Sequence, residues 1–390
     1  MNTPPPVPPL PESSRFTLDG SNALEGRLHA FCEEVRHRLA ALLPASRLEA
    51  VLLGGGYGRG EGGVRRTPAG DRPYNDLEFY VCLKGPARLN EWRFGRALHE
   101  LAESLALGIG VDVEFKIFSL RRLRREHLSM FSYDLVVGHR WVWGDESLLA
   151  GCEHHCDAAL IPEDEATRLL MNRCTGLLFA REHLQQLRLT DEDTDFIGRN
   201  LAKARLALGD AVLTVLGQYH WSCREREARL GRLTGGPGYP WLESVRRQHA
   251  AGVAFKLHPE PAPDRSRTSL EADLAALTAL SRTVWLWLEN RRLNRQFQSI
   301  EDYALTDVDK LPGQRAWRNR LIQARTSGWR GLLRGRYPRE QLFNALALLL
   351  WEPKSGQTRL TRHIQHQLGT LASGPTGLLD AYRQLWVQFR

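Results

Sequence analysis

The sequence lacks long apolar runs. A membrane-spanning helix needs roughly 20 predominantly apolar residues, whereas the longest candidate here, Ala345–Trp351, is short and predicts a buried helix. The N-terminal stretch MNTPPPVPPLPESS also lacks the basic region and apolar segment of a secretory signal peptide. We therefore expect no membrane partner, and we expect the proline-rich residues 1–21 to form a disordered arm.

Cysteine is scarce, and its pattern argues against two classes of site. The six cysteines show no spacing typical of a disulfide framework, which favours a reducing, cytoplasmic location. The cluster CEHHC at Cys152–Cys156 could contribute zinc ligands. A structural zinc site usually takes four ligands from two separated pairs. No second pair stands out, so the pattern favours ordinary buried or surface cysteines.

Internal repeats and an extreme composition are also absent. Hydrophobic residues make up 42% and charged residues 25% of the chain, as in ordinary globular proteins, and 390 residues suffice for two domains. The net charge of +8 suits a polyanionic partner such as a nucleotide, RNA or an acidic protein surface. It does not choose among them.

The chain is organised around residues 51–81, with the sequence VLLGGGYGRGEGGVRRTPAGDRPYNDLEFYV. A short apolar strand leads into a run of glycines, whose missing Cβ atoms let backbone N–H groups approach an anion. On a second strand, Asp76 and Glu78 are two residues apart, so both carboxylates lie on one face. A phosphate cradle beside two carboxylates is what a metal-bound nucleoside triphosphate requires.

The motif GGYGRGE at Gly55–Glu61, followed by NDLE at Asn75–Glu78, resembles the signature of the DNA polymerase β-like nucleotidyltransferase superfamily. The sequence of its first half most resembles that of the uridylyltransferases that modify the PII signalling protein, which are much larger chains. Gly56 stands where the family usually has serine. The loop between the motif halves is also longer than usual, and it carries Arg65, Arg66 and Arg72.

A third strand is predicted at Val111–Phe118, where apolar and polar residues alternate. Asp112, Glu114 and Lys116 share its polar face. In the superfamily that the motif resembles, a third carboxylate comes from a strand in this position. Either acid could complete the site; we favour Asp112, with Glu114 as the alternative.

The periodicity predicts two domains. An α/β nucleotidyltransferase domain at residues 22–150, with a small mixed sheet and flanking helices, precedes an all-α helical-bundle domain at residues 151–390 that would bind the substrate. Helices are predicted at residues 24–43, 89–107, 163–189, 195–219, 270–293 and 339–351.

The resemblance implies an attack by an acceptor hydroxyl on the α-phosphate of a nucleoside triphosphate, ATP by preference, with release of pyrophosphate. The acceptor would be a small molecule or a protein. Asp76, Glu78 and Asp112 would hold two Mg²⁺ ions. Triphosphate contacts are expected at Gly55, Gly56, Tyr57 and Arg59. Lys203 and Asp210, two helical turns apart, could touch nucleotide or acceptor, but a solvated lysine and a surface aspartate explain them equally well.

Two other functions are open. Residues 282–339 hold thirteen lysines and arginines, with Trp285, Trp287, Trp317 and Trp329 among them. Such a combination can bind RNA through phosphate contacts and stacking, which would suit an enzyme that adds nucleotides to RNA ends. The spacing of Trp285 and Trp287 favours packing instead. The third hypothesis is a catalytically inactive nucleotide-binding regulatory protein.

Overall fold

The computed structural model describes residues 15–236, 238–260, 265–312, 316–327, 337–352 and 358–389. The chain forms two compact units. Unit 1 is the chain up to Pro162 together with two later segments, Leu216–Leu233 and Ala250–Glu260. Unit 2 is Glu163–Val215, Thr234–His249 and Pro261–Arg390. The N-terminal unit thus extends beyond the predicted boundary at residue 150 and is discontinuous in sequence.

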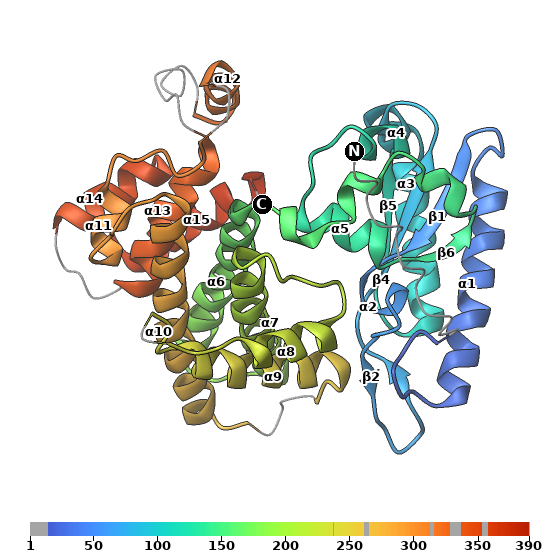
Figure 1. The fold of residues 1–390 in the computed structure, drawn as a ribbon, viewed down its shortest axis with the longest axis horizontal. Coiled ribbons are helices and arrows are strands. Elements are labelled where there is room, and N and C mark those ends of the chain that lie inside the picture. The colour runs from blue at the N-terminus through green and yellow to red at the C-terminus, as the bar shows by residue number, and fades with distance from the viewer. Residues whose placement is uncertain are drawn as a thin grey trace. The chain divides into compact units, whose positions relative to one another are not determined.

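Unit 1 contains a four-stranded sheet, a two-stranded hairpin and surrounding helices (Figure 1). Its strands are β1 (Leu48–Leu53), β2 (Val64–Arg65), β3 (Arg72–Pro73), β4 (Leu77–Leu83), β5 (Val113–Phe118) and β6 (Arg140–Trp143). Its helices are α1 (Asn22–Leu42), α2 (Gly55–Gly58), α3 (Ala87–Ile109), α4 (Leu120–Leu123), α5 (Met130–Val137) and α8 (Cys223–Arg232). Short 3₁₀ turns follow β6 at Glu146–Leu149, Glu153–His155 and Ala158–Leu160.

The four-stranded sheet is mixed, as predicted, with the order β5-β4-β1-β6. β4 and β5 are parallel, and β1 is antiparallel to both of its neighbours. Helix α3 makes the crossover between β4 and β5 and ends at the C-cap Gly110. A parallel pair needs such a crossover because a tight turn cannot return the chain to the same edge.

Successive side chains of the strands point to opposite faces of the sheet, and each face carries an apolar layer. One face of the sheet packs against α1 and α3 through Val51, Leu53, Leu77, Phe79 and Val81. The other face packs against α4 and α5 through Ala50, Leu52, Tyr80 and Cys82. Because Glu78 alternates with Leu77 and Phe79, it lies on the α4 and α5 face of the sheet.

The residues between the glycine turn and the acids form a hairpin. β2 pairs with β3 through Val64↔Pro73 and Arg65↔Arg72. Asp71, just before β3, receives a hydrogen bond of 2.7 Å from the Ser21 N–H. The prediction of a disordered arm is wrong for residues 15–21, because Phe16 is 1% exposed and belongs to the core of unit 1. The rest of the predicted arm lies outside the described residues.

The secondary structure of unit 2, in its described part, consists of helices (Figure 1). Its helices are α6 (Glu163–Leu184), α7 (Asp191–Val215), α10 (Arg267–Arg292), α11 (Ile300–Leu305), α12 (Ala316–Ser327), α13 (Pro338–Trp351), α14 (Thr358–Leu368) and α15 (Pro375–Phe389). Helix α9 (Leu242–Leu257) begins in unit 2 and ends in unit 1. Among the described residues, no helix combines the length and apolarity needed to cross a membrane.

Helix α7 starts before the predicted residue 195 because of its capping residues. The Thr190 N–H and hydroxyl both donate to Asp193 Oδ2, at 3.0 and 2.7 Å, and the Asp193 N–H donates to Thr190 Oγ1 at 3.1 Å. This reciprocal arrangement satisfies N–H groups that have no acceptor within the helix. It fixes the start of α7 within the polar run TDED, which apolar periodicity overlooks.

The core of unit 2 centres on Trp285, which is 0% exposed. Its ring contacts those of Tyr303, Phe343 and Trp351, with centroids 5.4–5.9 Å apart. Packing therefore explains this tryptophan, as its spacing predicted. Trp317, by contrast, is 59% exposed, and Trp329 lies outside the described residues.

Trp285→Ala should reduce the free energy of unfolding by about 3–5 kcal/mol, because it removes a large ring from a close-packed core. Trp317→Ala is the matched control and should change it by less than about 0.5 kcal/mol, as is usual for surface substitutions. Denaturant unfolding of the full chain measures both. Equal effects of the two substitutions would contradict the assignment of Trp285 to the core.

Candidate functional site

The acidic residues of the predicted site meet where β4 and β5 begin. In the parallel pair, Glu78 lies directly beside Glu114, and Asp76 immediately precedes β4. One carboxylate oxygen from each of Asp76, Glu78 and Glu114 lies within 4.8 Å of the others. Asp76 and Glu114 are exposed and Glu78 is half-buried, so the cluster is open to solvent.

The structure brings Glu114, rather than the favoured Asp112, to Asp76 and Glu78. The register explains the choice: Leu77 pairs with Val113 and Glu78 with Glu114, whereas Asp112 lies before the first pair. The Asp112 backbone carbonyl accepts a hydrogen bond of 2.9 Å from the Leu77 N–H. Asp112 therefore contributes to the start of the strand pairing, and Glu114 takes its place in the cluster.

Lys116 lies beside the carboxylates. Its Nζ is 2.7 Å from Glu78 Oε1 and 2.9 Å from Glu114 Oε2. Burial alone would lower the pKa of Lys116, but the hydrogen bond to Glu78 and the nearby acidic groups outweigh it, so the pKa is raised. The ammonium therefore stays charged and reduces the repulsion between the acids. Three carboxylates and one ammonium leave a net charge of −2.

The glycine turn approaches the acids closely. Gly55 has φ +63°, in the left-handed region that favours glycine, and a Cβ there would lie 3.2 Å from Glu78 Oε2. A Cβ at Gly56 would lie 2.9 Å from the Glu61 carbonyl oxygen. The family's usual serine at this position would therefore require the backbone to shift. The departure at Gly56 suits the tight path of this turn.

A pocket of about 120 Å³ lies beside the turn. It is lined by Gly54, Gly55, Arg59, Glu78, Tyr80, Phe131, Asp134 and Leu135. Pockets for drug-sized ligands usually measure about 300–1,000 Å³. This one is therefore large enough for an ion or a single phosphate group, and a whole nucleotide would have to extend beyond it.

Two residues expected at the triphosphate are already bonded within the protein. Arg59 Nη1 donates to Asp134 Oδ2 at 2.8 Å, so its charge is balanced by that carboxylate. The Tyr57 side chain is 1% exposed. Its hydroxyl donates to the Gly63 carbonyl at 2.8 Å and accepts from the Tyr74 N–H at 2.9 Å. The Tyr57 side chain is thus a buried support of the turn.

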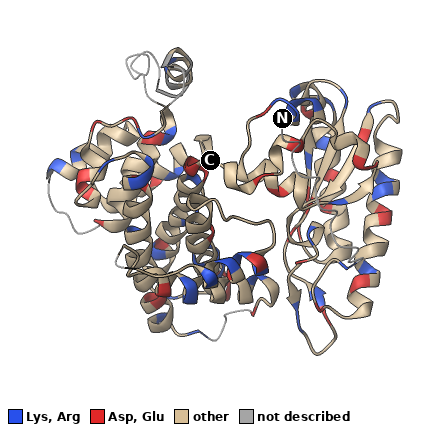
Figure 2. Cartoon of the chain, in the orientation of Figure 1, with Lys and Arg blue, Asp and Glu red and all other residues tan. Residues whose placement is uncertain are grey.

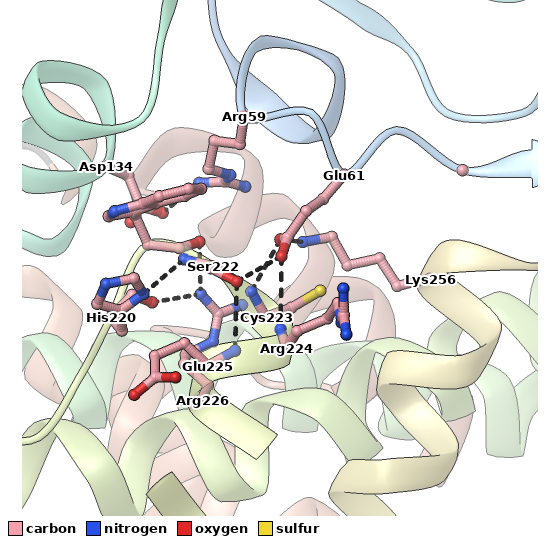
Figure 3. A network of polar contacts seen from close by, with 12 residues as sticks. Arg59, Glu61, Asp134, His220, Ser222, Cys223, Arg224, Glu225, Arg226 and Lys256 are labelled. Carbon is pink, nitrogen blue, oxygen red and sulfur yellow. Dashed lines mark hydrogen bonds and ion pairs between the residues drawn. The ribbon is translucent and has the colours of Figure 1, made fainter. Parts of the chain in front are cut away.

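Glu61, the last residue of GGYGRGE, is 3% exposed and lies at the N-terminus of α8 (Figure 3). Its carboxylate accepts hydrogen bonds from the Ser222 hydroxyl and from the Cys223 N–H, the latter at 2.8 Å. A carboxylate is favourable here because the first N–H groups of a helix lack acceptors and carry partial positive charge. Glu61 thus joins the glycine turn to the segment Leu216–Leu233.

The pKa of Glu61 reflects opposing effects. Burial raises it, but the charge of Lys256 and the hydrogen bonds from Ser222 and Cys223 outweigh burial, so the pKa is lowered overall. Lys256 Nζ lies 3.9 Å from Glu61 Oε2. Burial lowers the pKa of Lys256. The ion pair therefore stabilises the charged form of Glu61 inside the unit.

Arg59 reaches the same segment through Asp134 (Figure 3). The Tyr219 hydroxyl donates to Asp134 Oδ2 at 3.2 Å, and Arg226 donates to the His220 carbonyl at 2.7 Å. Arg226 also lies over the Tyr219 ring, 5.0 Å from its centroid. The two charged motif residues thus anchor a helix far along the chain.

The two candidates in the helical unit, Lys203 and Asp210, differ in burial. Lys203 is exposed on α7, whereas Asp210 is 6% exposed and accepts a hydrogen bond of 3.0 Å from His249 Nε2. In the CEHHC cluster, both histidines contact backbone carbonyl groups. The Nε2 atoms of His154 and His155 lie 3.0 and 2.9 Å from the carbonyl oxygens of Glu126 and Leu123, respectively. Among the described residues, the Asp76 cluster alone meets the geometry of a shared cation site.

The donor set of the acidic cluster fits a hard divalent cation such as Mg²⁺, which prefers carboxylate oxygens and retains several waters. The open cluster leaves room for such waters.

Sequence reasoning missed the partner roles of Lys116, Asp134 and Glu61. The alternation of residues 111–118 places Lys116 on the acidic face, so that signal was present. The partners of Arg59 and Glu61 are too distant in sequence to be found from a motif.

Glu61→Gln should reduce the free energy of unfolding by about 1–3 kcal/mol at pH 7, since a buried charge-assisted network is lost. Because the Glu61 pKa is lowered in the folded state, its contribution is present above the unfolded pKa of about 4.3 and is lost as pH falls through the lower folded value. Urea unfolding at several pH values measures this.

The control for Glu61 is Glu100→Gln, which removes a carboxylate from an exposed ion pair with Arg96 on α3. Its effect should be small at every pH. A Glu61→Gln protein as stable as wild type at pH 7, or a difference that grows in acid, would contradict the role assigned to this carboxylate.

Lys116→Met should make the protein more responsive to divalent cations. Without the ammonium, Glu78 and Glu114 repel each other, and a bound cation is attracted by their full negative charge. We expect Mn²⁺ to raise the melting temperature of Lys116→Met more than that of wild type in thermal unfolding. Lys84→Met, an exposed lysine at the far end of β4, should respond like wild type. A smaller response from Lys116→Met would show that Lys116 assists cation binding.

Comparison with known proteins adds no relative: no protein-family model, curated protein or solved structure matches this chain. The resemblance to nucleotidyltransferases therefore rests on the motif residues.

Proposed function

We propose that unit 1 carries the catalytic centre of a nucleotidyltransferase, which transfers a nucleoside monophosphate from a triphosphate, ATP by preference, to the hydroxyl of a small molecule or protein. The observation that carries this proposal is the convergence of Asp76, Glu78 and Glu114 within 4.8 Å. Gly55, whose positive φ suits glycine, lies against the same Glu78 carboxylate.

The proposal assigns roles to residues of the chain. Asp76, Glu78 and Glu114 would hold divalent ions, which supply positive charge to the attacking and leaving oxygens. The exposed carboxylates of Asp76 and Glu114 can also accept the proton of an acceptor hydroxyl. The first amides of α2, at Gly55 and Gly56, lack acceptors within the helix and can donate to phosphate oxygens.

A second candidate is a catalytically inactive nucleotide-binding regulatory protein. Lys116 favours it, because its ammonium already bridges Glu78 and Glu114. The RNA-end alternative has less support: Trp285 is buried, and Trp287 packs against Tyr239 and Trp241 with centroids 5.9 and 5.2 Å apart.

Glu114→Gln should lower Mg²⁺-dependent pyrophosphate release by at least about 100-fold, because it removes a carboxylate from the cation site. Asp112→Asn should keep the rate within about twofold, as expected of a group outside the cluster. The assay supplies each labelled triphosphate with Mg²⁺ and hydroxyl acceptors and follows pyrophosphate and label. Circular dichroism checks that both variants fold.

Chelation of divalent cations should abolish turnover of the wild-type chain. Nucleotide binding without turnover, unchanged in Glu114→Gln, would select the inactive regulatory protein. Loss of turnover in Asp112→Asn with full activity in Glu114→Gln would return the third carboxylate to Asp112.

A further inference from the structure

A second pocket of unit 1 lies where β4 and β5 end. Its volume is about 680 Å³, within the range of small-molecule sites. It is lined by Glu49, Leu83, Lys84, Gly85, Pro86, Ala87, Ser119, Arg121, Arg122, Arg124, Arg125 and Glu126. Glu78 lies near the other end of β4, about 16 Å along the strand from Leu83 at 3.3 Å per residue. The pocket is therefore separate from the acidic cluster.

The sequence RRLRRE builds the basic wall of this pocket. Leu120 and Leu123 are 1% and 0% exposed and anchor the single turn of α4 in the core. With these two leucines inward, the four arginines between positions 121 and 125 are all exposed. Figure 2 shows lysine and arginine gathered around α4 at this end of the sheet.

The arginines of the wall differ in what they already bind. Arg124 donates to the carbonyls of Ala150 and Leu148, both at 2.8 Å, which fixes its position. Arg122 pairs with Glu126. Within the described residues, the side chains of Lys84, Arg121 and Arg125 have no hydrogen-bond or ion-pair partner.

The charge of the pocket is strongly positive. Lys84 and the four arginines supply five positive charges, and Glu49 and Glu126 supply two negative ones, for a net charge of +3. Two exposed arginines elsewhere on unit 1, Arg36 and Arg96, each pair with an acid three or four residues away. A concave surface with unpaired cations is suited to an anion with several charged oxygens.

We infer that this pocket binds a small ligand with two or more phosphate groups. Its lining contains no aromatic residue, so it lacks the stacking platforms on which proteins hold the bases of single-stranded nucleic acid. Its concave form suits a compact ligand better than an extended strand. Lys84, Arg121 and Arg125 supply the charges, and Arg124 keeps the wall in place. This site does not depend on the proposed nucleotidyltransferase activity.

The test is calorimetric titration of the full chain with inorganic tripolyphosphate in a buffer containing a chelator. Without divalent cations the acidic cluster repels the probe, so binding reports the basic pocket. Wild type should bind one tripolyphosphate per chain, and orthophosphate more weakly. Arg121→Gln/Arg125→Gln should weaken the affinity by at least about tenfold, because two charged contacts are lost.

The matched control is Arg65→Gln/Arg93→Gln, which removes the same charge from exposed positions outside the pocket. It should change the affinity by less than about twofold if contacts rather than net charge determine binding. Asp76→Asn/Glu78→Gln should also leave it unchanged, which separates this site from the proposed catalytic centre. Circular dichroism verifies that every variant is folded.

Three results would overturn the inference. The first is the absence of saturable binding by wild type. The second is equal weakening by the two arginine pairs, which would mean attraction by net charge alone. The third is tighter binding of single-stranded RNA than of tripolyphosphate through the same arginines, which would make this face a nucleic-acid surface.

Discussion

The structure of the candidate site depends on the parallel pairing of β4 and β5. This pairing places Glu78 directly beside Glu114 on one face of the sheet, so two carboxylates that would separate in solution are held together by the backbone. Positive charge nearby reduces the repulsion between them. Lys116, two residues after Glu114 on β5, supplies this charge. The pairing that makes the cluster attractive to a cation thus also brings an ammonium of the chain to the same carboxylates.

The side chains of the motif residues lie in two different surroundings. Asp76 and Glu78 are available to solvent or to the pocket, whereas Arg59 and Glu61 are directed into unit 1 and bind partners there. Arg59 and Glu61 therefore help to fix the position of α8. Substitutions at either residue would act through the fold of unit 1, so stability must be measured for every variant.

Local pattern was sufficient for the mixed sheet, the helix between β4 and β5 and the placement of Asp76 and Glu78 on one face, because alternation and helical periodicity report burial directly. It failed to select Glu114 over Asp112. Both residues share a face, and the register between two parallel strands depends on how α3 packs, which a strand's own residues do not encode. The return of Leu216–Leu233 to unit 1 was equally hidden, since it rests on buried contacts between residues distant in sequence.

The discontinuity of unit 1 has a consequence for biosynthesis. Ser222 follows Glu61 by 161 positions, and the last segment of the unit ends at Glu260. A ribosome releases the sheet and the glycine turn long before it releases α8 and the end of α9. During that interval the Glu61 carboxylate has neither its helix nor Lys256, and the nascent unit must wait in an incomplete state. Closing contacts over such separations is slow, so the interval is when this protein is most exposed to misfolding and proteolysis.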